Sequence, residues 1–156
     1  MEGNVHDEIV LPVLLVEDNL DHAELISRCL DEELNGGRLY HVRDGEEALE
    51  FLEHKGAYVE PATSPRPALI FMDLRLPRLD GLSLLRVIKN DRRLSPIPVV
   101  VLSTSTADAD IEGAYAAQAN AYLAKPLNFD EFRMNLRCAA RFWLKCNHTP
   151  REKTGA

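Results

Sequence analysis

The sequence is short of several features that would place it in whole classes of protein. It has three cysteines, Cys29, Cys138 and Cys146, which form no CxxC pair and leave one thiol unpaired in any disulfide scheme. No apolar stretch approaches the roughly 18 residues that a membrane helix needs. The start of the chain lacks the basic and then apolar segments of a secretion signal. We therefore predict a cytoplasmic protein without membrane association, in which the cysteines are small apolar fillers and Cys146 is exposed.

A basic surface is also missing. The formal net charge is -7, and nonspecific binding to a phosphate backbone requires clustered Lys and Arg, so we expect no nucleic-acid partner. With 156 residues, 46% of them hydrophobic and 28% charged, the chain is long enough for one domain with a full core. We expect a polar lead-in over 1–8, one domain over 9–144 and a flexible tail over 145–156.

Short apolar runs alternate with stretches of helical periodicity. The predicted strands are 9–16, 39–42, 69–73, 97–102 and 120–124. The predicted helices run from Asp21 to the Gly36-Gly37 pair and over 45–55, 82–91, 108–119 and 129–144, with Asp80 as the N-cap of the third. The segment 56–67, rich in proline, is predicted to be an exposed loop without a readable function. Five strands alternating with five helices predict a doubly wound α/β domain with a parallel sheet.

Acidic residues stand where two of the predicted strands end. The apolar run 69–72 ends in Asp73, and the first run ends in Glu17-Asp18. Taken alone, an aspartate after a strand is more often a turn or capping residue than a catalytic one. However, the first and third strands are expected to be neighbours, which brings the three carboxylates to one edge. Mutual repulsion there would be relieved by a hard cation such as Mg²⁺, which prefers oxygen ligands.

Two further strands end in residues that suit the same chemistry. Ser103 follows the fourth strand and Lys125 follows the fifth. A cation, an ammonium and a hydroxyl around a carboxylate nucleophile can stabilise charge on the oxygens of a phosphoryl group. Each residue also has a simpler explanation, because Ser103 could cap a helix, Lys125 could be a surface lysine and Glu17-Asp18 could form a solvated turn.

Together these motifs resemble the receiver domain of two-component response regulators. The resemblance covers about Val13 to Leu144, and it rests on Glu17-Asp18, Met72-Asp73, Ser103-Thr104 and Lys125-Pro126. It implies a flavodoxin-like (βα)5 fold with strand order 2-1-3-4-5. The stretches 15–19, 42–45, 103–106 and 142–144 further resemble single-domain regulators that partner phytochrome-type histidine kinases.

The resemblance implies a role for each acidic residue. Asp73 would be the phosphoacceptor, while Glu17, Asp18, Asp73 and the backbone carbonyl of Arg75 would bind Mg²⁺ or Mn²⁺. The chain would not be an enzyme in the usual sense, because it would catalyse only its own phosphoryl transfer and hydrolysis. The departure from the family at Arg75 leaves two alternatives: its guanidinium screens the acyl phosphate from water, or it points into solvent.

The resemblance also implies the residues that read the phosphoryl group. Lys125 would pair with its oxygens, Ser103 would hydrogen-bond one of them, and Tyr122 would be the aromatic residue that moves inward during switching. The Lys125-Pro126 bond would be cis. Ser105, two residues after Ser103, lies where the family tunes the phosphoryl lifetime.

A sensor histidine kinase, of the phytochrome type, is the partner that this resemblance implies. No second domain follows in the sequence, so we expect output by protein contact. The last helix would pack Phe132, Leu136, Ala139 and Trp143 on the sheet. Its other apolar residues, which are either part of a broad buried face or the surface of a homodimer with the tail as an exchanged arm, are Met134, Cys138 and Phe142.

Two alternatives belong to other functional classes. A haloacid-dehalogenase-type phosphatase also uses an aspartate nucleophile and Mg²⁺, but it needs a second carboxylate where this chain has Arg75. A flavodoxin-like electron carrier needs a phosphate loop where Glu17 and Asp18 would repel phosphate. A further alternative, within the same class, is a phosphorelay intermediate without its own output.

Overall fold

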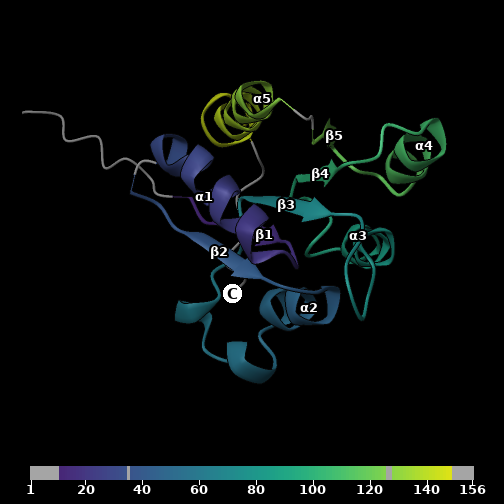
Figure 1. Cartoon of the computed structure of the whole chain (residues 1–156). Helices are drawn as coiled ribbons and strands as arrows, with labels where there is room; N and C mark the ends of the chain where they lie inside the picture. Colours follow the sequence, from purple (N-terminus) through teal and green to yellow (C-terminus); the bar gives the residue numbers. More distant parts are fainter. Residues whose placement is uncertain (1–10, 35, 126–127, 149–156) are drawn as a thin grey trace, which may run out of the picture.

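Five parallel strands form the centre of the molecule. The computed structural model describes residues 11–34, 36–125 and 128–148, and its sheet has the order β2-β1-β3-β4-β5 (Figure 1). The strands are β1 (Val13–Val16), β2 (Leu39–Val42), β3 (Leu69–Asp73), β4 (Val99–Ser103) and β5 (Ala121–Ala124). The flavodoxin-like order implied by the resemblance to receiver domains is confirmed.

Helices cover both faces of this sheet. The helices are α1 (Leu20–Leu34), α2 (Gly45–Glu53), α3 (Gly81–Asn90), α4 (Asp108–Ala116) and α5 (Phe129–Arg141). One face is covered by α1 and α5 and the other by α2, α3 and α4, as Figure 1 shows. Among the described residues, no helix is both long and apolar enough to cross a membrane.

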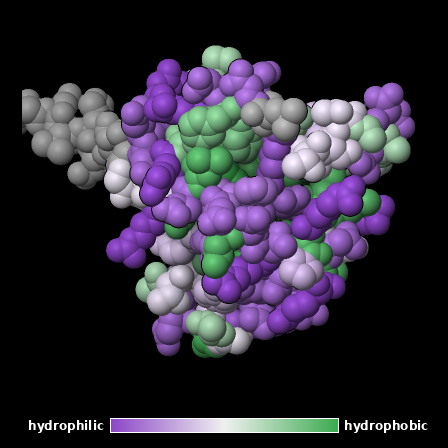
Figure 2. All heavy atoms as spheres, in the orientation of Figure 1, coloured by the Kyte–Doolittle hydropathy of each residue, from purple (hydrophilic) through white to green (hydrophobic). Residues whose placement is uncertain are grey.

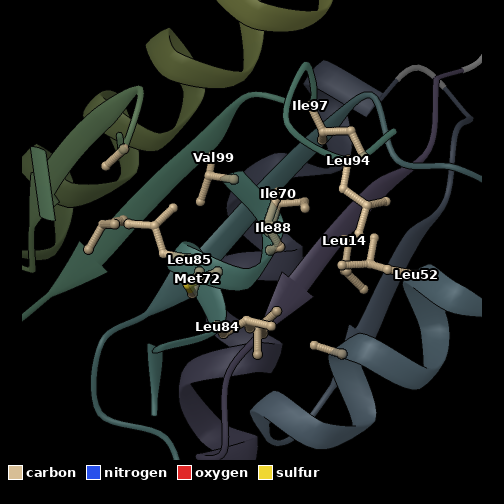
Figure 3. Close-up of a cluster of buried hydrophobic side chains, with 14 of the residues drawn as sticks. Leu14, Leu52, Ile70, Met72, Leu84, Leu85, Ile88, Leu94, Ile97 and Val99 are labelled. Atoms are coloured by element: carbon tan, nitrogen blue, oxygen red, sulfur yellow. The ribbon is translucent and has the colours of Figure 1, made fainter. Parts of the chain in front are cut away.

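The central strands are buried on both sides, as their unbroken apolar runs predict. Side chains from Leu69 to Met72 have no exposed area. Alternate residues face the two helical layers; Figure 3 shows Ile70 and Met72 packed with Leu84, Leu85 and Ile88 of α3. This packing holds β3 rigidly and therefore fixes where Asp73 leaves the sheet.

Several element ends differ from the sequence-based prediction. The predicted helix 45–55 stops at Glu53 because His54 adopts a left-handed φ of 56°. The predicted helix 108–119 stops at Ala116, just before Gln118 at φ 73°. The fourth strand begins at Val99 and not at 97, since Pro98 precedes it and has no N–H for the ladder.

The segment 56–67 contains regular turns and is not a simple loop. It contains two 3₁₀ turns, η1 (Gly56–Tyr58) and η2 (Pro61–Thr63). Ser64 beside them is buried, with 1% of its area exposed. The ring of Tyr58 packs edge-on against Phe51, and its hydroxyl donates a hydrogen bond of 2.7 Å to Glu47 of α2. The loop is thus tied to α2 by contacts that its proline-rich sequence did not predict.

The last helix continues beyond its predicted end. After Arg141 a π-helical turn, η3 (Phe142–Cys146), follows, so Lys145 and Cys146 are helical rather than part of a tail. The face of α5 that is fully buried includes Ala140 rather than Ala139. The remaining tail, 149–156, and the lead-in over 1–8 lie outside the described residues, as does Pro126 and with it the predicted cis bond.

The cysteines divide between core and surface. Cys29 is buried between α1 and α5, which confirms that it fills apolar space. Cys146 is exposed, as predicted. Cys138 is exposed too, so the prediction of a filler is wrong there. The reason is that Cys138 lies on the side of α5 that faces away from the sheet.

A buried carboxylate joins α1 to α5. Glu33 is 4% exposed. Its oxygens lie within 3.5 Å of cationic groups on Arg137, Arg141 and Lys145. Burial alone would raise the pKa of Glu33, but these three cations outweigh it and hold the pKa below its usual value. The ion pairs orient α5 on the sheet and leave its outer side exposed.

Candidate functional site

Three carboxylates meet at the carboxyl-terminal edge of the sheet. Glu17 and Asp18 follow β1, and Asp73 ends β3, which pairs with β1 so that Val16 lies opposite Met72. One oxygen from each of the three carboxylates lies within 4.8 Å of the others. Glu17 is almost fully buried, whereas Asp18 is exposed. The site therefore combines a fixed inner ligand with outer ligands that a cation from solvent can reach.

The ammonium of Lys125 joins two of these carboxylates. Its Nζ lies 2.9 Å from Oε2 of Glu17 and 2.9 Å from Oδ2 of Asp73. Lys125 reaches them because β5 pairs with β4, which pairs with β3. Burial lowers the pKa of the ammonium, but the hydrogen bonds to Glu17 and Asp73 raise it further than burial lowers it. The lysine is therefore charged at neutral pH.

The electrostatics of the cluster favour a cation. Burial raises the pKa of Glu17, and the nearby Asp73 adds to this, although Lys125 partly opposes both effects. Among the three carboxylates, Glu17 and Asp73 share one ammonium, and ionising the buried Glu17 still costs free energy. A hard divalent cation bound to oxygen ligands would remove that cost, so these residues fit Mg²⁺ or Mn²⁺.

The loop after Asp73 is held close to the acceptor carboxylate. The backbone N–H of Arg75 donates to Oδ1 of Asp73 at 3.1 Å, and that of Gly81 donates to the carbonyl of Leu74 at 2.9 Å. Asp80 caps α3 through the N–H of Ser83, as predicted. The side chain of Arg75 is exposed and forms no ion pair with any described residue. This placement favours the alternative in which its guanidinium points into solvent.

The two residues predicted to switch lie on neighbouring strands. Ser103, at the end of β4, is 2% exposed, and its hydroxyl accepts a hydrogen bond of 3.1 Å from the N–H of Ser105. Tyr122 on β5 is half-buried, and its hydroxyl donates to the carbonyl of Ser105 at 2.8 Å. Both therefore contact the same residue of the loop between β4 and α4.

Two histidines beside Glu17 were missed in the sequence. Nε2 of His41, on β2, donates to the backbone carbonyl of Glu17 at 2.7 Å. Nδ1 of His22, on α1, lies 3.7 Å from Oε1 of Glu17. A signal for His41 existed, because 39–42 was predicted as a strand and parallel pairing with the first strand would bring it alongside.

A groove of about 290 Å³ opens next to Lys125. Its residues come from α1, from the loop after β4 and from the start of α5, and a hydrophobic patch between these helices is visible in Figure 2. The lining residues are His22, Leu25, Ile26, Thr104, Lys125, Phe129 and Phe132. The acidic site is thus bordered by an apolar surface that solvent can reach.

A doubly wound sheet that carries an acidic cluster, a lysine and a buried serine at the ends of four strands defines a receiver-type domain. The chain belongs to the family of response regulator receiver domains, whose model matches residues 13–137. Among curated proteins, it is 42% identical to the probable methanogenesis regulatory protein FilR2 of Methanothrix harundinacea (strain 6Ac). That match covers 88% of this chain and 86% of FilR2.

The chain is also similar to regulators from cyanobacterial light signalling. It is 38% identical to response regulator Rcp1 of Synechocystis sp. (strain ATCC 27184 / PCC 6803 / Kazusa), over 85% of this chain and 88% of Rcp1. Its fold matches the Mn²⁺-bound structure of Rcp1 with a TM-score of 0.81 over 90% of this chain and 99% of that one, at 36% identity. It matches the phosphorylated cyanobacterial phytochrome response regulator RcpA with a TM-score of 0.83, at 38% identity and the same coverage.

Proposed function

We propose that this response regulator accepts a phosphoryl group on Asp73 from a histidine kinase and signals by protein contact. The observation that carries the proposal is the double contact of Lys125 with Glu17 and Asp73 within the acidic cluster. An oxygen of Asp73 would attack phosphorus, the bond from phosphorus to the histidine nitrogen would break, and an acyl phosphate would form. Attack of water on phosphorus would later break the bond to the oxygen of Asp73, release inorganic phosphate and return the carboxylate.

Each neighbour of Asp73 has a role in this transfer. Glu17, Asp18, Asp73 and the carbonyl of Arg75 would hold Mg²⁺ or Mn²⁺, which supplies charge neutralisation between the carboxylates and the phosphoryl oxygens. The ammonium of Lys125 would form an ion pair with an oxygen of the bound phosphoryl group. Since Asp73 gains negative charge in the reaction, an ammonium already at 2.9 Å needs little reorganisation to stabilise it.

Ser103 and Tyr122 would convert the phosphoryl group into a change of shape. The hydroxyl of Ser103 accepts a hydrogen bond from Ser105, and among the described residues it donates to none, so its proton can be donated to a phosphoryl oxygen. Tyr122 is linked to the same loop through Ser105. Movement of Ser103 toward Asp73 would therefore shift Ser105 and change the hydrogen bond that Tyr122 donates to it.

The kinase is proposed to be of the phytochrome type. The similarity to RcpA and Rcp1 supports this partner. The apolar groove beside Lys125 suits a protein that must bring a phosphohistidine to Asp73 while packing on α1 and α5. Such a kinase domain works in the cytoplasm, where we place this chain. A phosphatase is disfavoured because Arg75, two residues after Asp73, is an exposed cation and cannot act as a general acid.

We further propose a homodimer through the outer side of α5 and the start of η3. Met134 and Phe142 are 59% and 48% exposed, and Cys138 between them is exposed too. The helix is acidic in its first turn, at Asp130 and Glu131, and basic in its last, at Arg141. In an antiparallel pair, acidic and basic turns of the two copies face one another, whereas a parallel pair would oppose like charges.

Phosphorylation is tested with Mg²⁺ and acetyl phosphate, and the acyl phosphate is detected by its slower migration in a phosphate-affinity gel. We expect the shifted band in the unsubstituted protein and in Asp108→Asn, an exposed control on α4. We expect none in Asp73→Asn. A shifted band that persists in Asp73→Asn would contradict the assignment of the acceptor.

A further inference from the structure

The first turn of α4 lacks an ordinary cap. The residue in the N-cap position is Ala107, which has no side chain that can accept a hydrogen bond. Helices normally satisfy their first backbone N–H groups with a Ser, Thr, Asp or Asn at this position. Another residue must therefore anchor the start of α4.

Ser105 supplies this anchor from two residues upstream. Its hydroxyl oxygen accepts a hydrogen bond of 3.2 Å from the N–H of Ala107. The same hydroxyl donates to the carboxylate of Asp110, which lies in the first turn of α4. Both Ser105 and Asp110 are half-buried, so water competes only partly for these bonds.

The backbone of Ser105 contacts both switch residues. Its N–H donates to the hydroxyl of Ser103, and its carbonyl accepts from the hydroxyl of Tyr122. All the polar atoms of this one residue are thus engaged, with Ser103, Tyr122 and α4 as their partners. Ser105 is therefore hydrogen-bonded to both switch residues, and a movement of Ser103 changes the bond that its hydroxyl accepts from Ser105.

We propose that Ser105 is the positioning residue that passes the chemical state of Asp73 to the first turn of α4, through its hydroxyl and Asp110. The inference rests on the proposed phosphorylation of Asp73. When the hydroxyl of Ser103 turns to the phosphoryl group, the shift is carried by the N–H of Ser105 and changes the anchor of α4.

The test compares amide hydrogen exchange of residues 104–116 with and without beryllofluoride and Mg²⁺, while ¹⁹F NMR reports the fluoride bound at Asp73. We expect beryllofluoride to change exchange in α4 of the unsubstituted protein. Ser105→Ala should bind beryllofluoride but lose most of that change. Without beryllofluoride its α4 amides should exchange ~10-fold faster, since a hydrogen bond to a charged group is lost.

Matched variants separate coupling from general loosening. Ser105→Thr keeps the hydroxyl and should restore the response. Asp110→Ala should lose as much of the beryllofluoride-induced change in α4 exchange as Ser105→Ala does. The double variant should lose no more of it than either single variant. Ser83→Ala is the control, because Ser83 makes the same kind of bond to Asp80 at the start of α3, and it should leave the response of α4 unchanged.

Two results would overturn the inference in different ways. A full beryllofluoride response of α4 in Ser105→Ala, with fluoride bound, would refute the role of Ser105 and leave the proposed function standing. Absence of bound fluoride in the unsubstituted protein would refute the proposed function and the inference with it.

Discussion

The ammonium of Lys125 lies 2.9 Å from Oδ2 of Asp73, although 52 residues separate the two in the sequence. The same ammonium contacts Glu17, which is 1% exposed. The lysine therefore neutralises a buried carboxylate in the resting state and is already in place for a phosphoryl group. Because a bound divalent cation would neutralise the same carboxylates, we expect the free energy of unfolding of Lys125 variants to depend on Mg²⁺.

Replacing Lys125 with Met should lower the free energy of unfolding by about 3 kcal/mol without Mg²⁺, because buried carboxylates lose their counter-charge. Added Mg²⁺ should recover much of the loss, since it supplies positive charge at the same oxygens. Urea denaturation with and without Mg²⁺ measures both values. The control is Lys145→Met, whose 3.2 Å contact with Glu33 is distant from the site and half exposed. Equal gains from Mg²⁺ in the two variants would contradict the assignment of the metal site.

A second prediction concerns the close approach of α3 to the acceptor strand. A Cβ atom on Gly81 would lie 2.2 Å from the carbonyl oxygen of Asp73. Gly81→Ala must therefore push the loop away from Asp73, at a cost of about 2 kcal/mol or more. We also expect weaker Mg²⁺ binding, followed by titration calorimetry. Gly113→Ala, where nothing lies within 4 Å of the added atom, should change neither property adversely. Unchanged Mg²⁺ affinity in Gly81→Ala would show that the loop does not position a ligand.

Lys89 is expected to make stability rise with pH. Its Nζ donates to the carbonyls of Ser95 and Ile97 and to Oδ1 of Asn120, and burial lowers its pKa to about 8. Between pH 8 and 10 the unfolded chain keeps a proton that the folded protein releases, so the free energy of unfolding increases. We expect a gain of about 1 kcal/mol, less than the full shift implies, because the three hydrogen bonds favour the charged form and the group is only half-buried.

Denaturation at pH 7, 8, 9 and 10 measures this slope. Lys89→Met should remove most of it while lowering stability at pH 7, since the three acceptors lose their donor. Tyr58 acts in the opposite direction near pH 10, because burial and its hydrogen bond to Glu47 raise its pKa to about 12 and the unfolded chain loses the proton first. The comparison with Lys89→Met cancels this effect, since Tyr58 is present in both proteins. A slope that is the same in Lys89→Met would assign the effect to another group.

The proposed dimer makes a prediction for Phe142. Phe142, the first residue of η3, continues the exposed row of Met134 and Cys138 on α5. Phe142→Asp places a charge in this row and should convert the dimer to a monomer, as measured by light scattering. Val59→Asp changes a residue that is 60% exposed on a distant loop and should leave the mass unchanged. A mass that Phe142→Asp does not change would count against α5 as the interface.

Much of the site was predictable because the chemistry sits at strand ends. The run from Leu69 to Met72 can only be buried, and parallel strands place the residues that follow them at one edge. Glu17, Asp18 and Asp73 could therefore be placed together without coordinates. By contrast, the contacts of His41 with Glu17 and of Tyr58 with Glu47 were not predicted. Each depends on the direction of a side chain between elements far apart in the sequence.

The sequence by itself determined the fold and the identity of the acidic cluster, since hydrophobic periodicity and strand ends are local properties of the chain. Only the tertiary structure decided how Lys125 is shared between Glu17 and Asp73, which side of α5 stays exposed, and that Ser105 joins Ser103, Tyr122 and α4. The physical reason is that hydrogen bonds and ion pairs act over about 3 Å. Whether they form depends on how the layers pack, which no local pattern specifies.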